Sequence, residues 1–103
     1  MEVLAEAKHI IDTGDYILDS ENFYDIATDT IHITSDNFTD EYSLFTLLHE
    51  VAHRYQKRNG LINEMGRYSL EIEANRLAAK ALLMYNDIFL SKPFKRYIKT
   101  LVE

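Results

Sequence analysis

Residues 41–59 read EYSLFTLLHEVAHRYQKRN and have the apolar spacing of an amphipathic helix, with Gly60 as a stop. Residues four apart lie on one face of a helix, so His49 and His53 stand together at the edge of the apolar face. The apolar face itself comprises Leu44, Leu47, Leu48, Val51, Ala52 and Tyr55. This segment is therefore predicted to be a core helix that presents two histidines side by side.

The pentapeptide HEVAH, residues 49–53, is the HExxH pattern of zinc hydrolases. His49 and His53 can reach one metal ion, and Glu50 lies where a carboxylate can take a proton from a water molecule activated by that ion. The alternative is an amphipathic helix whose histidines lie four apart by chance. Residues 44–48 favour the metal site, because they bury the helix and half-buried imidazole rings need partners for their nitrogens.

A metal ion needs a third protein ligand, and a second helix predicted over residues 67–90 offers two glutamates. Glu71 shares its stripe with small residues, which permits close approach to the first helix. Glu73 shares its stripe with Arg76 and Lys80, the pattern of a solvated face. We therefore expect Glu71 to be the ligand, as a buried carboxylate neutralised by the metal, and keep Glu73 as the alternative.

The sequence does not decide two supporting roles: the hydrogen-bond acceptor for a metal-bound histidine and the residue that stabilises the oxyanion. Asn75 lies one turn after Glu71, and its side-chain carbonyl could accept the second ring N–H of a metal-bound histidine, or simply pack within its own helix. Zinc peptidases often add a Tyr, His or Arg that stabilises the oxyanion. The candidates, among which the sequence does not choose, are Tyr55, Tyr68, His32 and Arg76.

The remaining segments predict an α+β fold, in which a small antiparallel hairpin or sheet packs on a two-helix, zincin-like core with a short helix at each end. We expect residues 1–103 to form a single zincin-like metallopeptidase domain. The other expected elements are a helix over 2–12 ending at Gly14, an extended piece over 16–18, strands over 24–27 and 30–34 joined at Thr28-Asp29, and a last helix starting near Pro93.

Composition limits the classes of function. The chain contains no cysteine, so a metal must be held by His, Asp or Glu. The net charge of −6 argues against a nucleic-acid partner, and the basic run at residues 92–99 is expected to be a solvated helix face. No stretch has the length of a membrane span or the pattern of a secretory signal, so we expect a cytoplasmic protein without a membrane partner.

The two motifs together resemble the ImmA/IrrE family of zinc metallopeptidases. HEVAH follows LFTLL, and EIEANRLAAKALLM begins at Glu71, within a resemblance that covers about residues 24–84. It implies Zn²⁺ held by His49, His53 and Glu71, with Glu50 as the catalytic residue and a protein or peptide as substrate. The family commonly has a proline after the Leu-Leu-Met end of the second motif; Tyr85 stands there instead, so we expect that helix to continue.

Family members often occur in phages and mobile elements, where they are paired with or cleave repressor-type proteins. The leading hypothesis is a zinc-dependent endopeptidase that cleaves a specific protein partner, such as a repressor-type regulator. The hairpin could offer an edge to an extended substrate by strand addition. The main alternative is a non-catalytic, zinc-stabilised module that sequesters a regulatory protein. A third is a metal-free helical protein that associates through Phe89, Phe94 and Tyr97. Glu50 favours the enzyme, because a purely structural metal site does not need that carboxylate.

Overall fold

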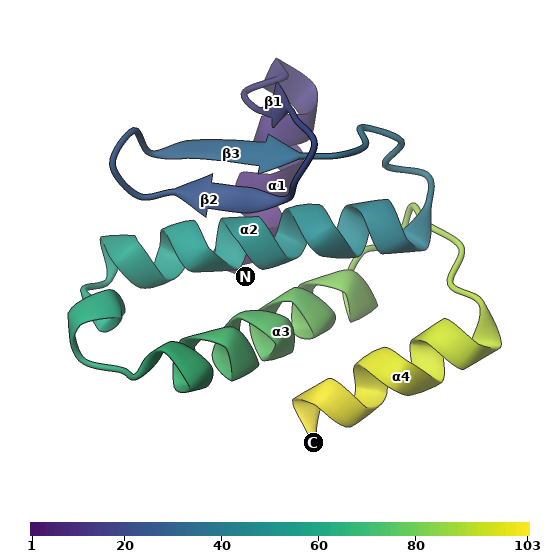
Figure 1. The fold of residues 1–103 in the computed structure, drawn as a ribbon. Helices are drawn as coiled ribbons and strands as arrows, with labels where there is room; N and C mark the ends of the chain where they lie inside the picture. The colour runs from purple at the N-terminus through teal and green to yellow at the C-terminus, as the bar shows by residue number, and fades with distance from the viewer.

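The computed structural model describes residues 1–103 and contains four α-helices and one small sheet (Figure 1). The predicted α+β fold is confirmed. In chain order the elements are α1 (Glu2–Thr13), β1 (Ile17–Leu18), β2 (Phe23–Asp25), β3 (Thr30–Ile33), α2 (Glu41–Arg58), the short 3₁₀ turn η1 (Leu61–Asn63), α3 (Arg67–Leu83) and α4 (Lys92–Val102). No helix combines the length and the apolar character that crossing a membrane requires.

The central element is α2, which lies between the sheet and α3, with α1 against it and α4 packed on α3 (Figure 1). The Asp40 side chain caps its first turn by accepting a hydrogen bond from the Ser43 backbone N–H, at 2.9 Å. Gly60 follows its end with a φ of +72°, a conformation that glycine adopts without strain. The predicted apolar face is buried, with Leu44, Leu47, Leu48, Val51 and Ala52 fully inaccessible and Tyr55 partly so.

The sheet has the strand order β1-β3-β2, with β2 antiparallel and β1 parallel to β3, so the predicted hairpin is extended by a parallel strand. Ile31 and Ile33 are fully buried, whereas His32 between them is partly exposed, as the alternation of a strand requires. The connection between β2 and β3 is a four-residue turn over 26–29, wider than the predicted two-residue turn. The Asp25 carboxylate shapes it by accepting the backbone N–H groups of residues 27 and 28.

The second long helix ends at Leu83, so the prediction that it continues to residue 90 was wrong. Met84 is its C-cap, and the backbone N–H of Tyr85 bonds to the carbonyl of Leu82 in a tighter turn. Tyr85, Ile88 and Leu90 then pack against the core, which a continuing helix would have carried away from it. Tertiary packing therefore overrides the local helical pattern here.

The last helix, α4, has the predicted Pro93 in its first turn and buries Ile98 completely. Phe94 meets Phe45 of α2 edge to face, with 6.0 Å between ring centroids. The basic run forms an exposed stripe with no ion pair, as expected for a solvated face: Lys92, Lys95, Arg96 and Lys99.

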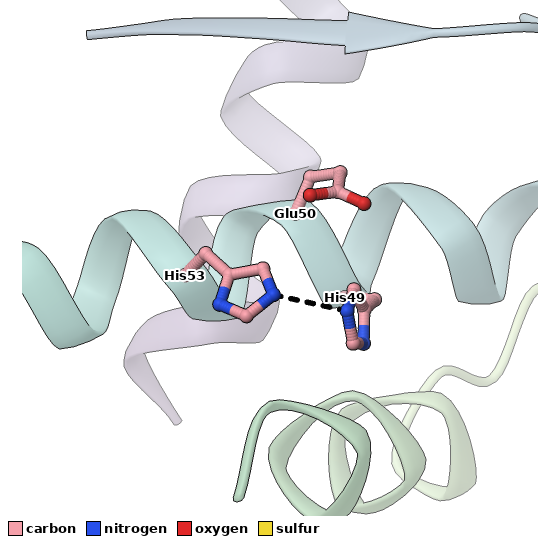
Figure 2. A group of neighbouring side chains, drawn as sticks. All are labelled: His49, Glu50 and His53. Atoms are coloured by element: carbon pink, nitrogen blue, oxygen red, sulfur yellow. Dashed lines mark hydrogen bonds between the residues drawn. The ribbon is translucent and has the colours of Figure 1, made fainter. Parts of the chain in front are cut away.

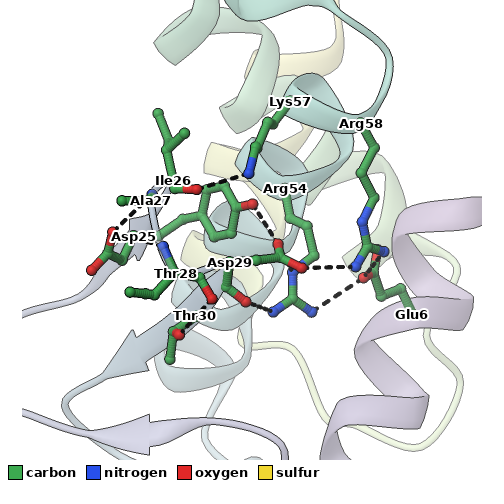
Figure 3. A network of polar contacts seen from close by, with 11 residues as sticks. Glu6, Asp25, Ile26, Ala27, Thr28, Asp29, Thr30, Arg54, Lys57 and Arg58 are labelled. Carbon is green, nitrogen blue, oxygen red and sulfur yellow. Dashed lines mark hydrogen bonds and ion pairs between the residues drawn. The ribbon is translucent and has the colours of Figure 1, made fainter.

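A polar network ties α1, α2 and the β2–β3 turn together (Figure 3). Arg54, only 5% exposed, donates to the Asp29 backbone carbonyl at 2.8 Å and pairs with Glu6 at 3.3 Å. Arg58, one turn later, pairs with the same two acidic residues from a half-exposed position. Burial and the neighbouring Asp29 carboxylate raise the pKa of Tyr24 to about 12, so its hydroxyl remains a donor to Asp29. The network fixes the turn against the helix that carries the HExxH motif.

We expect Arg54→Met to lower the free energy of unfolding by about 3 kcal/mol, at the low end for removing one partner of a buried ion pair, because Glu6 and Asp29 remain partly solvated. Arg58→Met removes a half-exposed cation with the same partners and is expected to cost less than about 1 kcal/mol. Urea unfolding of both variants provides the measurement. Equal losses of unfolding free energy in the two variants would show that the burial of Arg54 adds nothing to the stability that its ion pairs provide.

Candidate metal centre

The two motif histidines project from α2 toward α3, and Glu50 projects from the same helix toward the sheet (Figure 2). The Nε2 atoms of His49 and His53 lie 3.0 Å apart, with the two rings nearly perpendicular. Both side chains are less than one fifth exposed. Donor atoms of His49, Glu50 and His53 all lie within 4.8 Å of one another, so this group could hold a metal ion.

Glu71 reaches this pair of rings from the second turn of α3. Its Oε2 lies 3.2 Å from His49 Nε2, and its Oε1 lies 3.0 Å from His53 Nε2. The structure thus brings together the three side chains that the sequence nominated as ligands. The side chain of Glu71 is 51% exposed, so the expectation that it is buried was wrong. It lines a pocket, where its carboxylate contacts both rings and is half exposed to solvent.

The spacing of these atoms fits a small divalent cation. Zinc bonds of about 2.0–2.1 Å in a tetrahedral arrangement place neighbouring ligand atoms about 3.3 Å apart. The two histidine nitrogens lie 3.0 Å apart, and each lies 3.0 or 3.2 Å from a different carboxylate oxygen of Glu71, all of which is close to that value. Two imidazole nitrogens and one carboxylate are also a donor set that suits zinc and related transition metals.

Glu73 is placed differently from its predicted solvated face. It is partly buried and forms no ion pair with Arg76 or Lys80; its Oε1 instead accepts a hydrogen bond from Gln56 Nε2, at 3.3 Å. Gln56 is fully buried, and the same Nε2 donates to the Leu70 backbone carbonyl at 2.9 Å. Glu73 therefore lies at the contact between α2 and α3, where the Gln56 side chain stands between it and His53.

Gln56 determines which nitrogen of His53 carries a proton. Because its amide nitrogen faces two acceptors, its Oε1 must be the atom that lies 2.9 Å from His53 Nδ1, and an oxygen accepts. The proton of the neutral ring is then on Nδ1, and the lone pair of Nε2 faces Glu71 and His49. The sequence analysis did not single out Gln56, although residues 49, 53 and 56 have the spacing of one helical stripe.

His49 has no counterpart of Gln56: its Nδ1 is buried and forms no hydrogen bond. Asn75, the expected acceptor, lines a pocket with His49 and lies close enough to influence its ring, but no hydrogen bond of ordinary geometry joins it to that nitrogen. Burial, and next the proximity of His53, lower the pKa of His49, with Glu71 and Asn75 acting in the opposite direction. A neutral imidazole is the form that binds a metal.

Glu50 is 6% exposed and has no ion-pair partner in the structure. Burial, reinforced by the negative charge of Glu71, raises the pKa of its carboxyl group to about 7, and the backbone N–H of Tyr24 acts weakly in the opposite direction. A metal ion held by His49, His53 and Glu71 would offset the second of these causes. A carboxyl group of this kind can exchange a proton near neutral pH.

A pocket of about 450 Å³ opens over the histidines, Glu50 and Glu71. The edge strand β2, the turn after it, η1 and the start of α3 supply its other walls. Apolar side chains dominate these walls, and Arg67 is the one arginine or lysine that lines them. Residues of the edge strand β2 thus lie in the wall of the pocket that holds the two histidines.

None of the four oxyanion candidates lines this pocket. Tyr68 is 79% exposed, and Tyr55 packs against the hydrophobic core. His32 Nδ1 lies 2.9 Å from an Asp19 carboxylate oxygen, and its ring stacks on Phe23. Arg76 is exposed on α3. The structure does not bring these side chains to the histidine pair and Glu71.

Comparison with known proteins identifies the family. Residues 6–102 match the family model of a peptidase family described as the IrrE N-terminal-like domain. The chain belongs to this family. The resemblance to the ImmA/IrrE metallopeptidases is thereby confirmed, and a peptidase family implies a protein or peptide substrate. No curated protein and no solved structure matches the chain significantly.

Proposed function

We propose that this member of the IrrE N-terminal-like family is a zinc-dependent endopeptidase that cleaves a specific protein partner. The observation that carries the proposal is the Glu71 carboxylate lying across the Nε2 atoms of His49 and His53, with Glu50 beside them. In this proposal the two histidines and Glu71 hold Zn²⁺, and three protein ligands leave room for water or substrate, as catalytic zinc sites do.

When bound, the zinc ion supplies Lewis acidity, which acidifies a water molecule and polarises a peptide carbonyl. Glu50 accepts the proton of the attacking water at its carboxylate and then passes it to the leaving amine nitrogen. The burial of Glu50, which is 6% exposed, limits the access of competing water to that carboxylate. Gln56 keeps the proton of His53 on Nδ1 and so keeps the Nε2 lone pair directed at the ion.

Gln56→Leu should therefore weaken Zn²⁺ binding by roughly 10–100-fold, the usual effect of removing a partner of a metal-binding histidine. Leucine preserves most of the buried volume but accepts no hydrogen bond from His53. Competition with a chromogenic chelator measures the affinity, and circular dichroism shows whether the variant is folded. A folded variant with unchanged affinity would mean that the Gln56 amide only joins α2 to α3.

The environment of Glu50 favours an enzyme over a module that only sequesters its partner. A buried carboxylate without an ion-pair partner is costly, and a structural zinc site would not need one. We include in the proposal a repressor-type regulator of a phage or mobile element as the partner, because the family resemblance implies proteins of that kind.

The test uses the Zn²⁺-loaded protein with an unfolded casein and, separately, with the product of a gene adjacent to its own. Cleavage that stops with a chelator and returns with Zn²⁺ supports the endopeptidase. A stable complex with the neighbouring gene product, without cleavage of either protein, would instead identify a sequestering module. Elemental analysis of the purified protein checks that the metal is present in both experiments.

A further inference from the structure

A second pocket adjoins the metal centre on the side of α4. It has a volume of about 240 Å³ and shares His49 and Glu50 with the larger pocket described above. The two pockets therefore meet at the proposed catalytic carboxylate, one on the side of β2 and one on the side of α4. A peptide chain held at Glu50 has its neighbouring side chains beside both pockets.

Four of the eight residues that line this α4 pocket carry benzene rings, and the other four are Thr46, His49, Glu50 and Asn75. Tyr42 and Phe45 come from the start of α2, and Phe94 and Tyr97 come from α4. Phe94 is held by Phe45 edge to face and lies 6.2 Å from the tilted ring of Tyr97. Tyr42 and Tyr97 are 63% and 50% exposed, so they form the open rim while the two phenylalanines form the base.

Charge also restricts what the α4 pocket can accept. Glu50 is its one carboxylate, and no lysine or arginine lines it. An acidic side chain of a substrate would find no lysine or arginine in this pocket to pair with. Its volume is below the roughly 300–1,000 Å³ of pockets for drug-sized ligands, which suits one side chain rather than a whole molecule.

We propose that the α4 pocket binds a large apolar, preferentially aromatic, side chain of the substrate residue next to the bond that is cleaved. Tyr97 and Tyr42 determine this specificity by covering the bound side chain from two helices. The inference rests on the proposed endopeptidase function, which it deepens by specifying the class of substrate. It also gives α4 a role, because that helix closes one side of the substrate site.

The experiment digests a proteome-derived peptide library with the Zn²⁺-loaded full chain and identifies the new termini by mass spectrometry. We expect Phe, Tyr, Trp or Leu to be enriched at one position flanking the cleaved bond, with Asp and Glu depleted there. Two synthetic peptides, taken from a cleaved sequence and differing only by Phe or Ala at that position, then give kcat/KM values for each variant.

Tyr97→Ala should lower the ratio of kcat/KM for the Phe peptide over the Ala peptide by roughly tenfold, as expected for lost apolar contact in a specificity pocket. Tyr42→Ala, from the opposite wall, should lower the same ratio. Both residues are at least half exposed, so neither substitution removes core packing. Phe89→Ala is the matched control, because Phe89 is 85% exposed and lies outside the pocket, and it should leave the ratio unchanged.

Each outcome has a definite meaning. Enrichment of large apolar residues that falls in the Tyr97 and Tyr42 variants supports the inference. Glu50-dependent cleavage without such enrichment, or with a ratio that neither variant changes, overturns the inference and leaves the endopeptidase function standing. Absence of any Glu50-dependent cleavage overturns the proposed function and the inference with it.

Discussion

Glu50→Gln is expected to lower kcat by roughly 10²–10⁴-fold, the usual contribution of a general base, while Zn²⁺ binding is retained. Glutamine has nearly the same shape as glutamate but cannot accept a proton, so the change removes the proposed chemistry and preserves the packing of a side chain that is 6% exposed. The measurement is turnover of a cleaved peptide by wild type and variant, each at equal and verified zinc content.

Glu64→Gln is the matched control, because Glu64 is an exposed glutamate outside both pockets of the metal centre. It should keep wild-type turnover. A Glu50→Gln protein that cleaves as fast as wild type would rule out Glu50 as the base. Loss of zinc together with activity would place the carboxylate among the ligands instead.

Glu71→Ala should weaken Zn²⁺ binding more than about 100-fold, because removing a partner of a ligand already costs 10–100-fold and this change removes a ligand itself. The carboxylate contacts both imidazole nitrogens, at 3.0 and 3.2 Å, and no other carboxylate of α3 pairs with either ring. His49→Ala and His53→Ala should have effects of similar size. Competition with a chromogenic chelator gives all three affinities on one scale.

Glu73→Ala separates the two glutamates that the sequence left in competition. Glu73 touches the metal centre only through Gln56, so its removal should weaken Zn²⁺ binding by about tenfold at most. A larger loss of affinity in Glu73→Ala than in Glu71→Ala would reverse the assignment. Similar losses in both variants would point to a general disturbance of the contact between α2 and α3.

Much of the fold could be predicted because local signals and burial agree along α2. Its apolar stripe is long, a good stop residue follows it, and the stripe that holds the histidines faces the partner helix. The preference for Glu71 over Glu73 was likewise a matter of helical geometry, since small residues on one stripe allow α3 to approach α2. The burial expected for the two glutamates was nevertheless wrong, because Glu71 is half exposed and Glu73 is partly buried.

Features that depend on side chains meeting across the fold could not be predicted in the same way. Glu73 lies on a stripe with Arg76 and Lys80, yet it turns toward Gln56, because a buried amide needs acceptors from the neighbouring helix. The end of α3 at Leu83 depends on where Tyr85 and the residues after it find core contacts. Neither the burial of Gln56 nor the packing of Tyr85 is visible before the helices are placed.

The most direct test is anomalous diffraction at the zinc absorption edge from crystals grown with Zn²⁺. The account predicts one ion at about 2.0–2.2 Å from His49 Nε2, His53 Nε2 and a carboxylate oxygen of Glu71. An ion bound without Glu71, or no ion between the two imidazole rings, would contradict it.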